Sequence, residues 1–101
     1  MCGIFGIIGK SNNNLADIKS LAKYAKRRGA DSSGIMLFED EYIVERADFD
    51  ISTLTNDLKI NNPEIFLGIG RLITNDNYAN QPFLSDDICV FHNGIVVNDN
   101  E

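Results

Sequence analysis

An apolar strand signal stands almost at the start of the chain, directly after Cys2, and limits what the rest can fold around. Residues 3–8 read Gly-Ile-Phe-Gly-Ile-Ile, and Gly9 follows them. A short apolar run of this kind is typical of a buried β-strand, and glycines inside a strand mark places where another backbone approaches closely. The chain is therefore predicted to begin with a buried strand.

The segment after this strand has the periodicity of a helix. Asn14 can cap the helix with Asp17 three residues later, and the basic run at 26–28 suits the negative end of the helix dipole. Gly29 can then end the helix. Apolar residues recur on one face at helical spacing, at Leu15, Ile18, Leu21, Ala22 and Ala25.

The middle of the chain is predicted to form a hairpin and a short helix. Apolar residues at 35–38 and 42–44 flank the acidic Glu39-Asp40-Glu41, which indicates two paired strands with charge at their tip. Residues 51–58 are predicted to be helical. The Asn-Asn-Pro sequence at 61–63 breaks the pattern.

The last third of the chain contains further strand signals. Residues 65–69 are predicted to form a strand that leads into Arg71, and a polar loop follows at 74–80. Asn-Gly is a pair typical of tight hairpin turns. We therefore expect strands at 88–91 and 95–97, joined by such a turn at 92–94.

Composition places the chain among small globular domains. Its 101 residues are 44% hydrophobic and 24% charged, so one domain is the ceiling. A formal net charge of −6 gives no basic face for nucleic acid or an anionic membrane. The apolar run near the start is too short for a signal peptide or a membrane span. We expect a cytoplasmic protein with reduced thiols.

The two cysteines and the one histidine do not have the spacing of metal ligands. Cys89 lies on a predicted strand and is expected to be a core residue. Cys2 differs, because a small second residue permits removal of Met1 and leaves a cysteine with both a thiol and a free α-amine. The reference pKa of an α-amine, about 7.7–8.0, lets it accept the thiol proton near neutral pH. The alternative is that Cys2 is simply a buried cysteine near a terminus.

Five short motifs accompany each other in one order along the chain. They are MCGIFG at 1–6, RGADSSG at 28–34, GRLIT at 70–74, NQP at 80–82 and HNGIV at 92–96. Their order and spacing resemble the glutaminase domain of class II glutamine amidotransferases, which belong to the N-terminal-nucleophile hydrolases. The resemblance runs over residues 1–98 and covers about the first half of that domain. The form of the second motif looks closest to the sugar-amidating, glucosamine-6-phosphate synthase-like members.

The resemblance implies a reaction for Cys2. The thiol attacks the side-chain amide of L-glutamine and forms a γ-glutamyl thioester, which water hydrolyses to glutamate. The ammonia passes to a separate synthetase, transferase or isomerase domain or subunit. The family's oxyanion donors map onto the Asn93 side-chain amide and the Gly94 backbone N–H. No cofactor and no metal are implied. Read without the resemblance, Asn93-Gly94 is only a hairpin turn.

Further residues receive binding and supporting roles from the same resemblance. Arg71 matches the arginine that holds the α-carboxylate of glutamine, a role that suits its two-pronged guanidinium. Thr74 matches a neighbouring glutamine-binding position, whereas Asn75-Asp76 departs from the His-Gly pair of the glucosamine-6-phosphate synthases. The loop beside the nucleophile is expected to be organised by Arg28, Gly29 and Asp31. The alternative, a helix end followed by a polar turn, accounts for Arg28 and Gly29 almost as well.

His92 raises a different mechanism, in which its imidazole is the base for Cys2 as in papain-type hydrolases. In the family that the chain resembles, the histidine before Asn-Gly is not the base. A single histidine on a strand is also more often structural, so the α-amine of Cys2 is the preferred base.

The resemblance implies an α+β fold, the αββα sandwich of antiparallel sheets found in N-terminal-nucleophile hydrolases. Residues 1–101 correspond to a partial domain, with about the first half of these layers present. The C-terminal half, which carries an aspartate for the glutamine α-amine, and the acceptor domain are absent. Two functions are therefore open: a glutaminase domain that feeds a separate acceptor site, and a non-catalytic fragment that serves in association.

Overall fold

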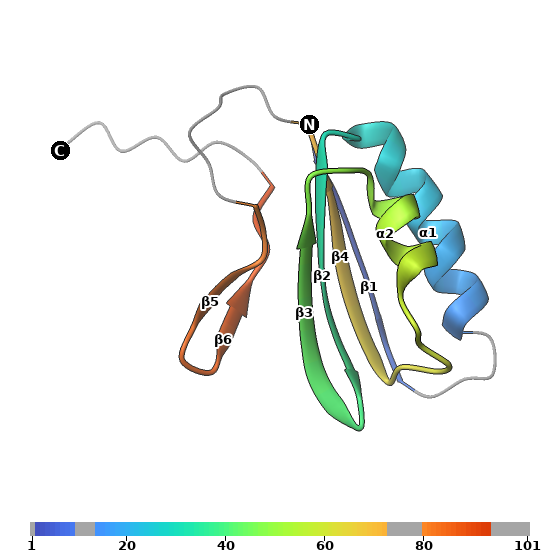
Figure 1. The fold of residues 1–101 in the computed structure, drawn as a ribbon, viewed down its shortest axis with the longest axis vertical. Coiled ribbons are helices and arrows are strands. Elements are labelled where there is room, and N and C mark those ends of the chain that lie inside the picture. Colours follow the sequence, from blue (N-terminus) through green and yellow to red (C-terminus); the bar gives the residue numbers. More distant parts are fainter. Residues whose placement is uncertain (1, 10–13, 73–79, 94–101) are drawn as a thin grey trace, which may run out of the picture.

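The computed structural model describes residues 2–9, 14–72 and 80–93, which form an α+β fold with antiparallel sheets, as predicted. Figure 1 shows two helices packed on one face of a four-stranded sheet and a small hairpin on the other side. In chain order the elements are β1 Gly3–Ile8, α1 Asn14–Arg28, β2 Ser32–Glu39, β3 Glu41–Ala47, α2 Ile51–Asp57, β4 Ile65–Arg71, β5 Phe83–Ser85 and β6 Ile88–Val90.

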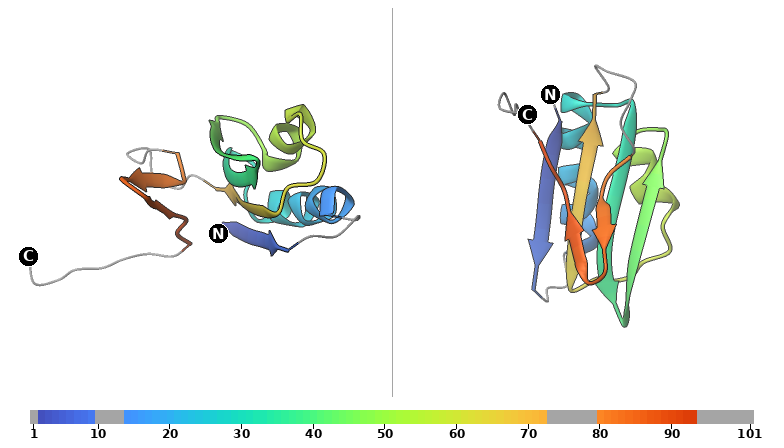
Figure 2. Two further views of the ribbon diagram at one scale, coloured as in Figure 1. Left: turned by 90° about the horizontal axis from the view of Figure 1, so that it is seen from below. Right: turned by 90° about the vertical axis from the view of Figure 1, so that its left-hand side faces the viewer.

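The larger sheet has the strand order β1-β4-β2-β3, and every neighbouring pair is antiparallel. β4 is therefore a central strand although it comes last of the four in the sequence. Both views in Figure 2 keep the helices on one face of this sheet and the β5–β6 hairpin on the other. The hairpin is a separate two-stranded sheet.

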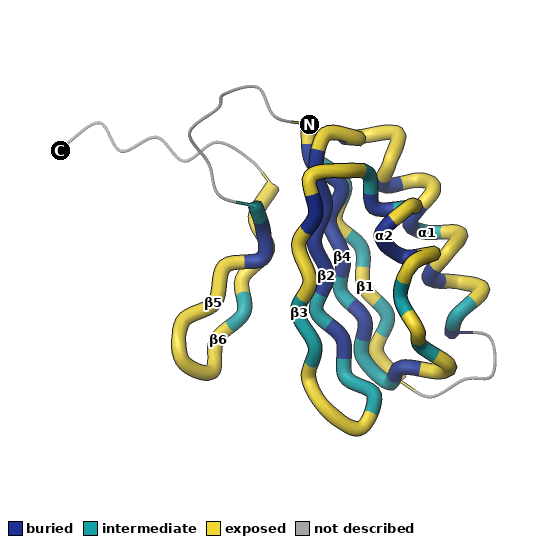
Figure 3. The backbone as a smooth tube through the Cα atoms, in the orientation of Figure 1, coloured by how far each residue is buried: buried dark blue, intermediate teal, exposed yellow. Residues whose placement is uncertain are grey.

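The hydrophobic core lies between the helices and the larger sheet. Ile18 and Ala22 of α1 meet Ile35 of β2 and Phe66 of β4, and all four side chains are fully buried. The ring of Phe5 stacks on Phe66 with centroids 5.9 Å apart. Figure 3 shows the contrast with the β5–β6 hairpin, which is mostly exposed.

β1 is half-exposed, which corrects the prediction of a buried strand. It stands at the edge of the sheet, and alternate residues face away from the helices. Ile4 and Ile8 are consequently 45% and 78% exposed. The close approach expected at a glycine is real at Gly3, where an added Cβ would lie 2.8 Å from Ala25 Cα of α1. Small residues thus bring the edge strand and the helix together.

The predicted helix and its apolar stripe are confirmed in α1, whose residues Ile18, Ala22 and Ala25 are buried. Asn14 is used differently from the expected cap. It is the first helical residue, and its side-chain Nδ2 donates to the carbonyls of Gly9 and Pro63, at 2.8 and 3.0 Å. The start of α1 is therefore tied to the residue that follows β1 and to the segment that precedes β4.

The central hairpin and the second helix are also confirmed. β2 and β3 are longer than the apolar runs suggested and meet at Asp40, whose φ of 72° closes the acidic tip. Asp50 caps α2 by accepting from Thr53 N–H at 2.9 Å, a cap that the sequence prediction missed.

The strand predicted at 88–91 is confirmed as β6, which is one residue shorter than predicted. β6 pairs with β5 through a turn at Asp86 and Asp87, a pairing that was not predicted, and the tight turn expected at 92–94 stays a prediction. Residues 91–93 belong to no helix or strand. The strand expected at 95–97 and the polar loop at 74–79 lie outside the described residues. β5 was not predicted because a three-residue strand carries little periodic signal.

Candidate functional site

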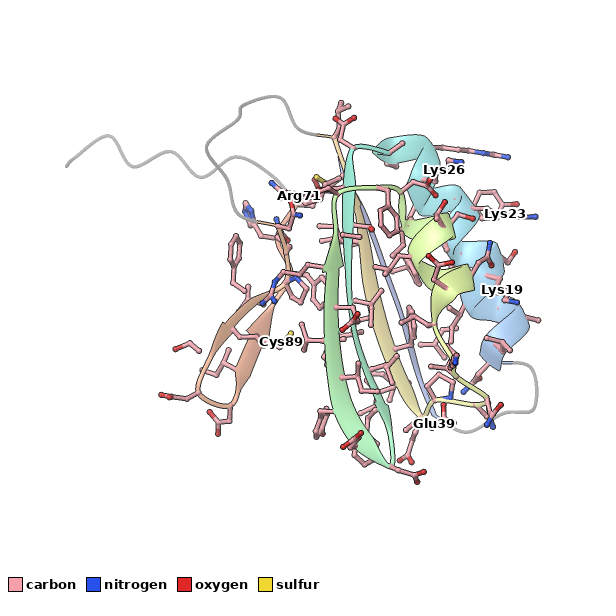
Figure 4. The ribbon with its side chains drawn as sticks, viewed as in Figure 1. Lys19, Lys23, Lys26, Glu39, Arg71 and Cys89 are labelled. Carbon is pink, nitrogen blue, oxygen red and sulfur yellow. The ribbon has the colours of Figure 1, made fainter. Side chains whose placement is uncertain are left out.

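One end of the larger sheet gathers three of the five motifs. Gly3 pairs with Gly70, so Cys2 and Arg71 come next at the same end of β1 and β4. Ser32 of β2 stands opposite Arg71 on the other side of β4. Figure 4 labels Arg71 at this end of the sheet, where Figure 1 also places the N-terminus. Strand register therefore brings together residues from distant parts of the sequence.

Cys2 meets Asn93 at this end of the sheet. The backbone nitrogen of Cys2 donates to Asn93 Oδ1 at 3.3 Å, across a sequence separation of 91 residues. With Met1 in place this nitrogen is an amide, and it becomes an α-amine when Met1 is removed. Two of the residues predicted to be catalytic are thus neighbours.

Cys2 and Asn93 also line a cleft of about 330 Å³ between β1 and α1. Phe5 lies on the strand side, and Tyr24 and Arg28 lie on the helix side. Small-molecule sites occupy clefts of about 300–1,000 Å³. The cleft therefore has room for a ligand of amino-acid size beside the thiol.

Arg71 ends β4 with most of its surface covered, being only 7% exposed. Its carbonyl accepts from the Asp31 N–H at 2.8 Å. A Cβ on Gly29 would lie 2.8 Å from Arg71 Cα and would overlap the peptide bond that follows it. The loop that carries Arg28, Gly29 and Asp31 is thus packed on the backbone of Arg71, and Gly29 is needed for this contact. Its φ is not positive, so it ends α1 without the left-handed conformation of a typical glycine cap.

Gln81 is a site residue to which sequence analysis assigned no role. It is 4% exposed, its Nε2 donates to the His92 carbonyl at 3.0 Å, and its Oε1 accepts from the His92 N–H at 2.6 Å. The NQP motif was the only signal that could have pointed to it. The peptide bond between Gln81 and Pro82 is cis.

Ser32 is a second residue that the sequence did not single out. Its side chain is fully buried beside Arg71 in the register of β2 and β4, and its Oγ has no hydrogen-bond partner among the described residues. Only its place in the RGADSSG motif hinted at a position near the site.

The other nucleophile and base candidates stand apart. The side chain of His92 is exposed, and within the described ranges no hydrogen bond joins its imidazole to Cys2. Cys89 is only partly buried on β6 and lies outside the hydrophobic core, which corrects its prediction as a core residue. Burial raises the pKa of the Cys89 thiol, against a smaller lowering by Arg46. This favours the unreactive thiol form at neutral pH.

Met1, Thr74 and Gly94 lie outside the described residues, so the predicted glutamine-binding threonine and the second oxyanion donor have no described geometry. Within the part that is described, no group of three or more histidine, cysteine, aspartate or glutamate side chains could hold a metal ion. None of the described helices is long and apolar enough to cross a membrane.

Comparison with curated proteins identifies relatives of one kind. The chain is 36% identical over 106 residues to the glutamine–fructose-6-phosphate aminotransferase (isomerizing) of Thermotoga maritima, which covers 97% of the chain. It is 31% identical over 105 residues to the enzyme of the same name from Methanococcus maripaludis and 34% identical over 109 residues to that from Clostridium perfringens. The chain spans only 17% to 18% of the length of these relatives. No protein-family model and no solved structure gives a match.

Proposed function

We propose that this chain carries the nucleophile for hydrolysis of glutamine to glutamate and ammonia. The chain belongs to the class II glutamine amidotransferase family, as the N-terminal part of a glucosamine-6-phosphate synthase-like glutaminase domain. The contact between Cys2 N and Asn93 Oδ1 is the observation that carries this proposal. It joins the proposed nucleophile and the proposed oxyanion donor, which both line one cleft. The names of the relatives, which act on glutamine and fructose 6-phosphate, support the same reaction class.

The proposed reaction begins when removal of Met1 frees the α-amine of Cys2. The neutral amine takes the thiol proton, directly or through water, and the thiolate attacks the side-chain carbonyl carbon of glutamine. A tetrahedral oxyanion forms. It collapses to a γ-glutamyl thioester as the α-ammonium returns the proton to the departing amine, which leaves as ammonia. Water then hydrolyses the thioester to glutamate and restores the thiol.

Asn93 suits the role of an oxyanion donor because of the way its amide is turned. Its Oδ1 accepts from the Cys2 nitrogen, so its Nδ2 and both of that atom's hydrogens remain to donate to a developing negative charge. Gly94 N–H is the proposed second donor. Removing one such donor typically costs about 100- to 1,000-fold in kcat.

Arg71 is proposed to bind the α-carboxylate of glutamine, with Thr74 beside it. Its backbone is held by Asp31 N–H and by the close approach of Gly29, which fixes the point from which the side chain extends. A guanidinium that starts from a fixed backbone loses less freedom on binding a carboxylate through two hydrogen bonds. Arg28 and Asp31 support this loop.

The remaining parts of the site belong to the longer protein that the relatives represent. The two-layer arrangement of helices and sheet, with the β5–β6 hairpin across the opposite face, is compatible with about half of an N-terminal-nucleophile hydrolase sandwich. In this proposal an aspartate from the following sequence binds the glutamine α-amine. The ammonia is delivered to an acceptor domain or subunit that amidates a sugar phosphate in the cytoplasm.

The test uses the whole reading frame that encodes this chain and measures glutamate release from glutamine. Cys2→Ser should abolish turnover, Cys89→Ala should retain it, and intact mass should show that Met1 is absent. Extending the N-terminus by one residue should also abolish turnover, because an amide nitrogen has no basic lone pair. His92→Gln should be tolerated. Normal turnover of the extended protein beside an inactive His92→Gln would replace the α-amine by the histidine. No turnover by the processed parent would leave the chain as a non-catalytic association domain.

A further inference from the structure

We propose that Gln81 is a positioning residue, whose side-chain amide holds the backbone of His92 and thereby fixes Asn93 against Cys2. The reaction it serves rests on the proposed function. The clamp itself rests only on contacts within the chain. The NQP motif at 80–82 contains this residue but gave it no role.

The two hydrogen bonds from Gln81 engage both polar groups of one residue's backbone. Nε2 donates to the His92 carbonyl at 3.0 Å, and Oε1 accepts from the His92 N–H at 2.6 Å. In a β-sheet, the same N–H and carbonyl groups would form hydrogen bonds with a neighbouring strand. Because residues 91–93 belong to no helix or strand, this side chain supplies the pairing that a sheet would otherwise give.

Gln81 can act as a clamp because its own backbone is anchored to the larger sheet. Its carbonyl lies so close to Gly34 of β2 that an added Cβ there would overlap it. The residue after Gln81 is tied to β3: Arg46 Nε donates to the Pro82 carbonyl at 2.9 Å. Contacts therefore run without interruption from the sheet through Gln81 to the residue before Asn93.

The direct contact of Asn93 with Cys2 is longer than the bonds that hold His92. At 3.3 Å between exposed groups it is longer than the usual N–H···O distance of about 2.7–3.2 Å. The His92 bonds are shorter, and the clamping side chain is buried. The position of the Asn93 amide consequently depends more on Gln81 than on Cys2.

Loss of the clamp should reduce kcat and leave KM nearly unchanged. Misplacing a catalytic group by about 1 Å can cost about 100-fold in rate. Glutamine is held in the ground state through Arg71, which Gln81 does not contact in any described hydrogen bond. Gln81→Met keeps the length of the side chain but removes both hydrogen bonds. We expect kcat to fall about 10- to 100-fold.

Gln81→Glu provides a second variant whose effect changes with pH. The ionised carboxylate can accept from the His92 N–H but cannot donate to the carbonyl, whereas the protonated acid can do both. We expect kcat of Gln81→Glu, divided by that of the parent at the same pH, to rise as pH falls. A side chain needed only for folding would change kcat and KM together and would show no such recovery.

The decisive comparison adds Asn80→Ala and a measurement that does not need activity. Asn80→Ala removes a neighbouring side-chain amide that ties the same segment to Asp48 and leaves the His92 contacts in place. Hydrogen exchange of the His92 amide should accelerate in Gln81→Met but not in Asn80→Ala, while circular dichroism stays unchanged. Equal losses of kcat in both variants, or parent-like kcat in Gln81→Met, would overturn the positioning role. If the parent releases no glutamate, the proposed function fails, and exchange alone decides: retained His92 protection in Gln81→Met would refute the clamp.

Discussion

Ser32 and Ser33 are adjacent and equally buried, but their hydroxyl groups differ in hydrogen bonding. Ser33 Oγ donates to the Phe49 carbonyl at 2.7 Å, whereas Ser32 Oγ finds no partner within the described parts of the chain. A buried hydroxyl without a partner costs free energy, while a buried hydrogen bond contributes modestly to stability. Such an orphaned polar group beside Arg71 is the kind of local cost that proteins carry near binding sites.

Alanine at these two positions should therefore have different effects. Ser33→Ala should lower the free energy of unfolding by about 1 kcal/mol, because it leaves the Phe49 carbonyl without its donor. Ser32→Ala should cost less than Ser33→Ala and can raise the stability. Urea unfolding of both variants followed by circular dichroism makes the comparison. A larger loss for Ser32→Ala would mean that its hydroxyl has a partner that stabilises the fold.

Arg71→Lys should weaken glutamine binding more than it slows the chemistry. An ammonium group cannot reproduce two parallel hydrogen bonds to a carboxylate. With hydrogen bonds to charged groups worth about 1.5–3 kcal/mol, KM should rise about tenfold or more. Steady-state glutaminase kinetics measure both constants. Arg27→Lys, a change on the exposed side of α1, is the matched control and should alter neither. An unchanged KM in Arg71→Lys would remove Arg71 from the binding site.

At the scale of elements, α2 depends on the carboxylate of Asp50. Burial works to raise the pKa of Asp50, but hydrogen bonds from the Thr53 N–H and hydroxyl, with Lys26 3.9 Å away, outweigh it and hold the pKa below its ordinary value. A carboxyl group with a lowered pKa stabilises the fold above its unfolded-state pKa. That contribution is lost as pH falls through the folded-state pKa.

Asp50→Ala should consequently lower the free energy of unfolding at pH 7 by about 1 kcal/mol, the usual effect of removing a helix cap. The difference from the parent should shrink in acid, below the ordinary pKa of an aspartate. Asp57→Ala, at the other end of α2, is the control and should not destabilise, since a negative charge there opposes the helix dipole. Thermal melts across this pH range provide the measurement. A difference that stayed constant with pH would exclude the carboxylate as the source.

The elements differ in how far the sequence could predict them. α1, the β2–β3 hairpin and β4 follow from local periodicity and turn residues, and all of these were predicted. The exposure of β1 was not, because being an edge strand is decided by sheet order. The pairing of β6 with β5 was missed for the related reason that strand partners are chosen by tertiary packing.

The candidate site was predicted from the resemblance more than from physical pattern. Nothing in local sequence joins Cys2 to Asn93, because the contact forms only after β1, β4 and the segment from Gln81 to His92 have packed. Gln81 escaped prediction because its role depends on two backbone bonds to a residue in another segment. A motif can mark such a residue but cannot state what its side chain holds.

For the whole molecule, the face of the larger sheet opposite the helices is only partly covered. Apolar side chains stand exposed there and on the hairpin, including Ile8 at 78% and Leu84 at 52%. β1 also leaves one side of its backbone unpaired within the described sheet. Exposed apolar surface beside an open strand edge promotes association of chains.

The 101-residue chain alone should therefore self-associate as its concentration rises, and Ile8→Lys should reduce this association. A lysine on an edge strand opposes pairing with another chain. The position is exposed, so the free energy of unfolding should change by no more than about 0.5 kcal/mol. Sedimentation velocity over a concentration series measures association, with Ile8→Val as the control that keeps the apolar surface. Equal association of the lysine and valine variants would place the contact elsewhere.

The long span between Cys2 and Asn93 also has a consequence in time. Protein synthesis adds about 5–20 residues per second, so the 91 residues that separate the two positions take about 5–18 seconds to make. During that interval the N-terminus has left the ribosome's catalytic centre while its partner does not yet exist. The proposed mechanism requires removal of Met1, and an enzyme that does this can work on an open end of chain in this period. Once Asn93 has been made and lies against Cys2, the Cys2 nitrogen is hydrogen-bonded to Asn93 Oδ1. Removal of Met1 then competes with this contact.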